Sequence, residues 1–148
     1  MELRIDPISP LAARESTLNP SPSTVLIVDD DSAVRELCSV EFKRSGFEVL
    51  VAENGDEAIR VARQTHPEIV ILDLIMPGSH GFEVLKTIRQ SRDLSNTVVI
   101  IRSGKSYKPD IDKALELGAD AYVVKPGDLE DLVRLASQHL EKRRSAHR

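Results

Sequence analysis

The chain has 148 residues, of which 41% are hydrophobic and 30% are charged, and its formal net charge at pH 7 is -4. This length suits one domain with its own core, and the composition is that of a globular protein. The net negative charge argues against a nucleic-acid binder or a protein that lies on a membrane surface. No segment approaches the ~20 apolar residues of a membrane-spanning helix, and no secretory signal is visible, so we predict a cytoplasmic protein.

The first 23 residues differ in composition from the rest of the chain. Prolines lie among Ser, Thr and Asn without a sustained apolar period, which predicts a disordered leader over residues 1–23. We place one domain over residues 24–141 and a basic C-terminal tail over residues 142–148, whose arginines we expect to form a solvated helix end. The single cysteine, Cys38, lies in an amphipathic pattern, which predicts a small core residue rather than a reactive thiol.

Five short apolar runs follow the leader. They are rich in Val and Ile and do not alternate with polar residues, which is typical of strands buried on both faces of a parallel sheet. Between them, apolar residues recur every three or four positions, which predicts helices. The strict alternation of strands and helices predicts a doubly wound α/β sandwich. The predicted strands cover residues 25–28, 49–52, 69–72, 98–101 and 121–124.

The predicted helices are marked by their ends as well as by their apolar faces. The first carries Leu37 and Cys38 on its apolar face and ends before Gly46. The fourth starts near Pro109, and the fifth has Asp128 as a candidate N-cap. The apolar patterns of the five helices span residues 34–42, 58–62, 84–88, 111–115 and 129–140.

Polar residues of a particular kind follow four of the strands. Asp29 and Asp30 come after the first apolar run, Asp73 after the third, Ser103 after the fourth and Lys125 after the fifth. In an open parallel sheet, ligands bind outside the carboxyl ends of the strands, where these residues would gather. Clustered carboxylates suit Mg²⁺, and a lysine and a hydroxyl suit a phosphoryl oxygen. A carboxylate at such a site can also be the nucleophile that forms an acyl phosphate.

The aspartates and Lys125 also have purely structural explanations. A run of aspartates after a strand is often a helix N-cap, a role that fits Asp31 best. Asp73 stands before a Met-Pro-Gly segment and fits a turn, and Lys125 fits a strand end. We favour a functional site because four separate strand ends carry suitable groups.

Residues from about 24 to 140 resemble the receiver domain of two-component response regulators. The similarity rests on VLIVDDDSAVREL at the first strand, ILDLIMPGSHGFEVL around the third, VVIIRSG at the fourth and GADAYVVKP at the fifth. The spacing from Asp73 to Ser103 and to Lys125 is also that of the family. The resemblance implies a flavodoxin-like (βα)5 sandwich with a five-stranded parallel sheet of order 2-1-3-4-5.

The resemblance also implies a role for each residue of the site. Asp73 would accept a phosphoryl group from a sensor histidine kinase or a histidine phosphotransfer protein in a Mg²⁺-dependent reaction. Asp30 would bind Mg²⁺ directly and Asp29 largely through water, with the backbone carbonyl of Ile75 as a further ligand. Lys125, together with Ser103, would hold the phosphoryl oxygens.

Three further residues take tuning or switching roles by the same resemblance. Tyr122 occupies the aromatic switch position and would turn inward into the space that Ser103 vacates; a plain core or surface tyrosine is the alternative. Ile75 and Lys105 would flank the path of the hydrolytic water. Because the apolar Ile75 cannot orient that water, we predict slow self-dephosphorylation. The bond between Lys125 and Pro126 is expected to be cis.

Phosphorylation would shift the face made by the fourth helix, the fifth strand and the fifth helix. That face would meet a downstream protein target and is also the candidate surface for a homodimer.

Three residues depart from the family pattern. His80 replaces the usual Asp before a glycine, Gly127 follows the Lys-Pro pair, and Arg102 precedes Ser103. We expect His80 to cap a helix or face solvent rather than bind a metal. We expect Arg102 to be a solvated charge, and the alternative is that it folds over the site.

The leading functional hypothesis is a stand-alone receiver, not an enzyme beyond its own phosphoryl transfer and slow dephosphorylation, because only the tail EKRRSAHR follows the last helix. A receiver fragment of a multidomain regulator, for example a transcriptional one, is the alternative. A phosphohydrolase with an aspartyl nucleophile is disfavoured because Ile75 stands where its usual acid would lie. A pseudo-receiver adaptor is disfavoured by the complete set of site residues.

Overall fold

The computed structural model describes residues 21–76 and 81–146. Most of the leader, His80 and the last two residues lie outside this range, so what we expect of them stays a prediction. The strands are β1 (Thr24–Val28), β2 (Glu48–Ala52), β3 (Ile69–Leu72), β4 (Val98–Ser103) and β5 (Ala121–Val124). The helices are α2 (Ser32–Arg44), α3 (Gly55–Thr65), α4 (Gly81–Gln90), α5 (Lys108–Glu116) and α6 (Leu129–Ala146), with the 3-10 turn η1 (Arg92–Leu94).

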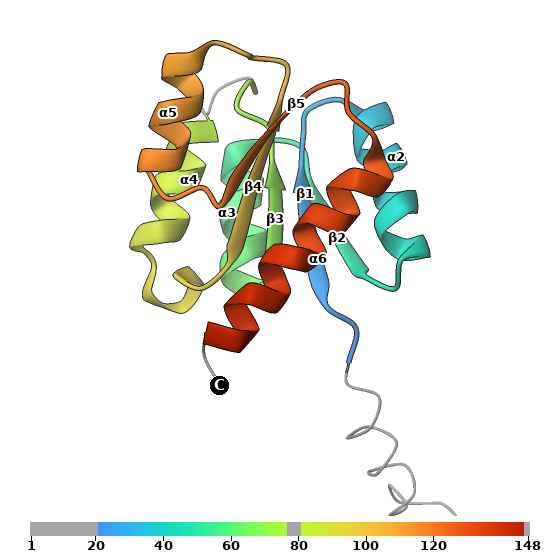
Figure 1. Ribbon diagram of the computed structural model, residues 1–148. Coiled ribbons are helices and arrows are strands. Elements are labelled where there is room, and N and C mark those ends of the chain that lie inside the picture. Colours follow the sequence, from blue (N-terminus) through green and yellow to red (C-terminus); the bar gives the residue numbers. More distant parts are fainter. Residues whose placement is uncertain (1–20, 77–80, 147–148) are drawn as a thin grey trace, which may run out of the picture.

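The five strands form one parallel sheet of order β2-β1-β3-β4-β5 (Figure 1). Helices α2 and α6 cover one face, and α3, α4 and α5 cover the other. This arrangement confirms the predicted flavodoxin-like sandwich. Among the described residues, no helix is long and apolar enough to cross a membrane.

Each face of the sheet has its own apolar core, because side chains alternate between the two faces along a strand. The core under α2 and α6 includes Ile27, Ile71, Ile100, Cys38 and Leu132. The opposite core is formed by the alternate strand residues together with α3, α4 and α5. The two cores hold the sheet rigid, and its carboxyl edge is therefore a fixed platform for functional side chains.

The central strands β1, β3 and β4 are buried on both faces, as predicted. For β2 and β5 the prediction is wrong, since Val51 is 46% and Val124 39% exposed. These two strands are the edges of the sheet, and the order of the strands alone decides which ones are edges. Strand β4 also runs further than predicted and includes Arg102 and Ser103.

Neighbouring residues of α2 differ in burial. Cys38 is 1% exposed, which confirms the predicted core position, and burial raises the pKa of its thiol. Leu37 is 61% exposed, so its predicted place on the apolar face is wrong. Successive side chains of a helix point about 100° apart, so Cys38 can face the core while the neighbouring Leu37 points toward solvent.

The predicted helix caps are confirmed at two positions. The Asp31 carboxylate accepts hydrogen bonds from the backbone N–H groups of Ala33 at 2.9 Å and Val34 at 3.4 Å, at the start of α2. The Asp128 carboxylate accepts one from the backbone N–H of Glu130 at 2.7 Å, at the start of α6. Gly46 follows α2 with a φ of 94°, a left-handed conformation that glycine adopts without strain.

A charge network lies at the amino edge of the sheet. Oδ2 of Asp120 accepts hydrogen bonds from Nη2 of Arg89 at 2.9 Å and the backbone N–H of Val99 at 2.8 Å, and its Oδ1 accepts one from Nη2 of Arg143 at 2.6 Å. Helix α6 ends at Ala146 and so includes most of the predicted tail. Within it, Arg143 is hydrogen-bonded to Asp120. Its neighbour Arg144 is exposed and pairs with Glu68 at 2.7 Å at the surface, so the expected solvated helix end is wrong for Arg143 alone.

Candidate functional site

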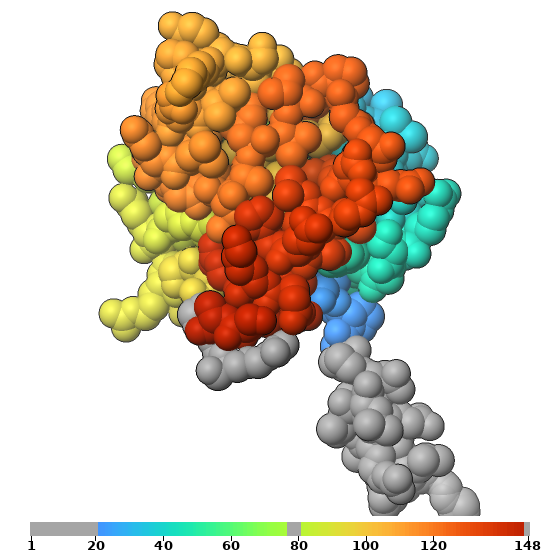
Figure 2. All heavy atoms as spheres, in the orientation of Figure 1, coloured from blue at the N-terminus to red at the C-terminus, as the bar shows by residue number. Residues whose placement is uncertain are grey.

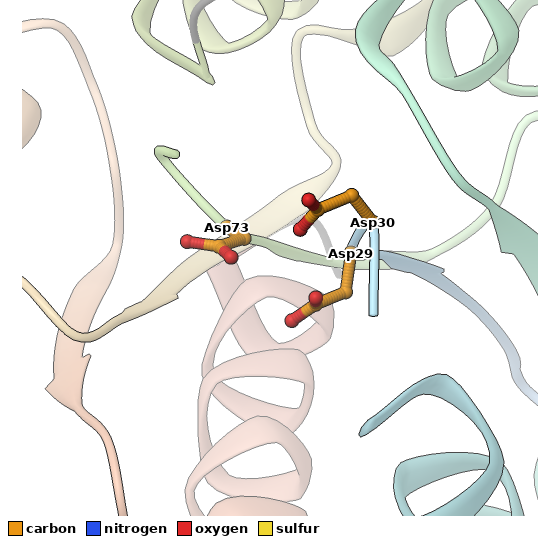
Figure 3. Close-up of side chains that lie close together, drawn as sticks. All are labelled: Asp29, Asp30 and Asp73. Carbon is orange, nitrogen blue, oxygen red and sulfur yellow. The ribbon is translucent and has the colours of Figure 1, made fainter. Parts of the chain in front are cut away.

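An acidic cluster lies at the carboxyl edge of the sheet, where β1 and β3 end. Asp29 and Asp30 follow β1 and Asp73 follows β3, and Figure 3 shows their side chains close together. Carboxylate oxygens of the three residues lie within 4.8 Å of one another. Asp29 and Asp73 are buried while Asp30 is exposed, so the cluster opens to solvent at Asp30.

Backbone N–H groups orient the two buried carboxylates. Oδ1 of Asp73 accepts a hydrogen bond from the backbone N–H of Ile75 at 3.1 Å. Oδ1 of Asp29 accepts one from the backbone N–H of Asp31 at 3.0 Å. Each carboxylate therefore has one oxygen fixed by its own loop and a second oxygen, Oδ2, that turns toward Lys125.

Lys125 bridges the two buried aspartates from the end of β5. Its Nζ donates hydrogen bonds to Oδ2 of Asp29 at 2.7 Å and Oδ2 of Asp73 at 3.2 Å. Burial alone would lower the pKa of Lys125, but its hydrogen bonds and attraction to the two carboxylates outweigh burial and raise the pKa. The ammonium group therefore stays charged and offsets part of the repulsion among the carboxylates.

Replacement of Lys125 by methionine is expected to destabilise the protein by about 2 kcal/mol in EDTA, because two buried carboxylates lose their counter-ion. Mg²⁺ should restore most of this loss, since it binds the folded cluster and supplies the missing charge. Thermal unfolding in EDTA and in Mg²⁺ measures both effects. Lys108→Met is the control, because its exposed pair with Asp112 should contribute little. Equal stability of Lys125→Met and wild type in EDTA would contradict the prediction.

Ser103 and Tyr122 are connected through the loop after β4. Ser103 is fully buried, its carbonyl accepts a hydrogen bond from the backbone N–H of Lys125 at 2.8 Å, and its Oγ accepts one from the backbone N–H of Lys105 at 3.3 Å. The half-buried Tyr122 donates its hydroxyl hydrogen bond to the Lys105 carbonyl at 2.8 Å. Nζ of Lys105 lies 3.7 Å from Asp110 and so pairs with α5 rather than with the acidic cluster.

The loop after β3 is shaped by close packing against α4. Ile75 follows Asp73 by two residues, and its side chain is 52% exposed beside the cluster. A Cβ at Gly81 would lie 2.6 Å from the carbonyl oxygen of Asp73 and 2.6 Å from Cα of Leu74. Any side chain at position 81 would therefore displace the Asp73 backbone, so the position requires glycine. At the end of β5, the Lys125–Pro126 bond is cis, as expected.

Two arginines near the site have positions that the sequence prediction misses. Nη1 of Arg35 donates to the carbonyl of Asp29 at 2.7 Å, and its Nη2 lies 3.8 Å from Oε2 of Glu53. The contact could be predicted from the position of Arg35 early in α2, because helical side chains lean toward the amino end of their helix. Arg102 is only 9% exposed, so the expected solvated charge is wrong. Strand alternation places its side chain under the helices, whatever its polarity.

The donor groups of the cluster fit Mg²⁺. All three are carboxylates, which are the hard oxygen ligands that Mg²⁺ prefers over imidazole or thiolate. The exposed side at Asp30 leaves room for the waters that Mg²⁺ usually keeps. The arrangement can therefore bind a divalent cation next to a carboxylate, Asp73, whose orientation the backbone fixes.

A doubly wound sheet with an acidic cluster and a bridging lysine at its carboxyl edge defines a receiver-type domain. The model of the response regulator receiver domain matches residues 25–137. The chain therefore belongs to the response regulator receiver domain family of two-component systems. This is a signalling family rather than a family of classical enzymes, and its members interact with histidine kinases and downstream targets.

Relatives and solved structures agree with this assignment. The DNA-binding response regulator MtrA of Mycolicibacterium paratuberculosis is 30% identical over 118 residues, which cover 80% of this chain and 51% of MtrA. A CheY-like receiver domain from Methanospirillum hungatei JF-1 has a TM-score of 0.81 and 25% identity, covering 85% of this chain and 99% of that one. The chemotaxis response regulator CheY4 of Vibrio cholerae has a TM-score of 0.75 and 27% identity, covering 80% and 98%. The chain spans about half the length of the curated relatives it matches.

Proposed function

We propose that the protein is a phosphoacceptor switch in which Asp73 receives a phosphoryl group from a histidine kinase or a histidine phosphotransfer protein. The observation that carries this proposal is the Asp73 carboxylate, with one oxygen held by the Ile75 N–H and the other by Lys125. An Asp73 oxygen attacks phosphorus and forms the P–O bond of an acyl phosphate, while the bond from phosphorus to the donor breaks. A cytoplasmic location stays a prediction that accords with this role.

Other residues of the cluster prepare this transfer. Asp30, Asp29 largely through water, Asp73 and the Ile75 carbonyl would hold Mg²⁺, and the bound ion would neutralise charge on the phosphoryl oxygens. Lys125 moves its hydrogen bond from the Asp73 carboxylate to a phosphoryl oxygen.

The output surface is the face formed by α5, β5 and α6, whose orange and red atoms lie together in Figure 2. Phosphorylation adds about -1.5 to -2 charge and three acceptor oxygens, which draw the Ser103 hydroxyl inward. Tyr122 of β5 donates a hydrogen bond to the Lys105 carbonyl, which lies in the loop after Ser103. A movement of this loop therefore also moves Tyr122 and β5. Leu115 on α5 and Val124 on β5 are exposed apolar residues available to a downstream protein or a second copy of the chain.

The test is incubation of the wild-type protein with Mg²⁺ and a small acyl-phosphate donor. Intact mass spectrometry should show the gain of one phosphoryl group, and it should require Mg²⁺. Borohydride reduction followed by peptide mapping should place the modification at Asp73. No gain of mass, or modification at another residue, would overturn the proposal.

The lifetime of the acyl phosphate tests the role of Ile75. Its apolar side chain cannot orient an attacking water, so we expect slow decay in the wild type. Ile75→Asn should accelerate decay by about tenfold, the effect of one hydrogen bond of about 1.4 kcal/mol. Ile75→Leu is the control, and the remaining phosphorylated fraction is followed by intact mass. Wild-type decay within seconds, unchanged in Ile75→Asn, would show that this role is wrong.

A second candidate function is that of the receiver portion of a larger transcriptional regulator. It is favoured by the curated relatives, because MtrA is described as DNA-binding and this chain covers 51% of its length. A stand-alone receiver is favoured by the solved CheY-like domains, which this chain covers almost completely. The position of the stop codon in the reading frame, relative to Arg148, distinguishes the two.

A further inference from the structure

Arg102 is a buried charged residue that the proposed mechanism does not use. It stands directly before Ser103 in β4 and is 9% exposed. Its Nη1 atom is buried and has no hydrogen-bond partner among the described residues. A buried guanidinium donor without a partner is costly. A further acceptor near Nη1 would therefore offset this cost.

The register of the sheet places Arg102 beside the phosphoacceptor. Ile71 of β3 pairs with Ile100 of β4, and both belong to the core under α2 and α6. Asp73 and Arg102 lie two residues further along these two strands, so they are neighbours across the sheet and are directed to the same face. Adjacent strands lie about 4.8 Å apart, a distance that an arginine side chain spans.

The charge of Arg102 acts in the same region as the charges of the cluster. Burial raises the pKa of the Cys38 thiol in α2, Arg102 lowers it, Asp29 raises it and Lys125 lowers it. Lys125 reaches Asp29 and Asp73 from the end of β5 by crossing β4, the strand that carries Arg102. Arg102 is thus a second cation on the side of the cluster that faces α2.

We propose that Arg102 is an additional ligand of the phosphoryl group on Asp73, donating hydrogen bonds from its guanidinium to a phosphoryl oxygen. This inference rests on the proposed function of Asp73. Before modification, the second cation opposes the binding of Mg²⁺ to the carboxylates. After modification, the acyl phosphate supplies an acceptor for Nη1 of Arg102, which has none among the described residues, and the planar guanidinium matches its oxygens.

Two variants separate this role from a structural one. Arg102→Met keeps an unbranched side chain without the charge, and Arg102→Lys keeps the charge without the guanidinium fork. Calorimetry measures the affinity of each for Mg²⁺ and then, in saturating Mg²⁺, for beryllofluoride, a tetrahedral phosphoryl analogue that binds to a carboxylate. We expect Arg102→Met to bind Mg²⁺ more tightly than wild type and beryllofluoride about tenfold more weakly. Arg102→Lys should bind Mg²⁺ like wild type and beryllofluoride more weakly.

The outcomes distinguish this inference from the proposed function. Beryllofluoride binding by wild type that is absent in Asp73→Asn supports the phosphoacceptor, and its absence in wild type would overturn that function itself. If wild type binds the analogue and Arg102→Met binds it equally well, only the role of Arg102 is overturned. If Asp73→Asn binds inorganic phosphate and Arg102→Met does not, Arg102 holds a free anion and the inference is again overturned. Should Arg102→Met fail to fold, wild-type affinity in Arg102→Lys would overturn it.

Discussion

The Asp73→Asn variant is expected to gain no phosphoryl group from a small acyl-phosphate donor, whereas the wild type gains one. The asparagine amide oxygen is not a carboxylate nucleophile and cannot form the acyl phosphate. The variant also loses one of the three carboxylates of the cluster, which weakens Mg²⁺ binding. Intact mass spectrometry over a time course, with and without Mg²⁺, measures the expected loss.

Two matched variants make this result specific. Asp93→Asn removes an exposed carboxylate of η1, away from the cluster, and should be phosphorylated like the wild type. Asp30→Asn keeps the acceptor but removes the exposed carboxylate of the cluster, so it should be phosphorylated more slowly and need more Mg²⁺. Equal phosphorylation of Asp73→Asn and wild type would rule out Asp73 as the acceptor.

The Asp120→Ala variant is expected to lose about 3 kcal/mol of unfolding free energy. The carboxylate neutralises Arg89 and Arg143 and accepts the backbone N–H of Val99. Burial lowers the pKa of Arg89 while Asp120 raises it, so the carboxylate sustains a partly buried guanidinium charge. Without it, two cations face each other and the Val99 N–H loses its partner. Chemical denaturation measures this loss, and thermal unfolding should show a Tm that is lower by about 10 °C.

The control for this prediction is Asp131→Ala on α6. Asp131 also pairs with an arginine, Arg134, but both side chains are exposed. An exposed pair contributes little, so this variant should stay within about 0.5 kcal/mol of the wild type. Similar losses in both variants would show that burial of the Asp120 network does not matter. Because Asp120 lies at the opposite edge of the sheet, folded Asp120→Ala should still accept a phosphoryl group.

The strands and the acidic cluster are predictable because they depend on local patterns and on one rule of topology. The runs at residues 69–72 and 121–124 agree with β3 and β5 at both ends. In a parallel sheet all carboxyl ends lie at one edge. Asp29, Asp73 and Lys125 therefore meet although they are far apart in the chain. Asp31 and Asp128 are predictable as caps because an N-cap bonds only to its own helix.

Exposure is less predictable, because it depends on what packs above each residue. Val51 and Val124 are of a residue type that is typical of buried strands, but they lie in the edge strands of the sheet and are exposed. Leu37 is apolar and helical, yet it lies just outside the stripe that meets the sheet. The sequence period gives the width of an apolar stripe only approximately, whereas the angle of the packed helix determines which residues it contains.

The sequence by itself determined the α/β sandwich and the acidic cluster, because these follow from apolar periodicity and from the residues at strand ends, while its resemblance to the receiver family singled out Asp73 as the phosphoacceptor candidate. Only the tertiary structure decided the placement of the remaining charges. Arg102 is expected to be a solvated charge but is buried in β4, the strand that pairs with the one before Asp73, and Arg143 is expected in a solvated helix end but is hydrogen-bonded to Asp120. The free energy of a charged side chain depends on the distances and burial of groups distant in sequence, and only packing of the whole domain sets these.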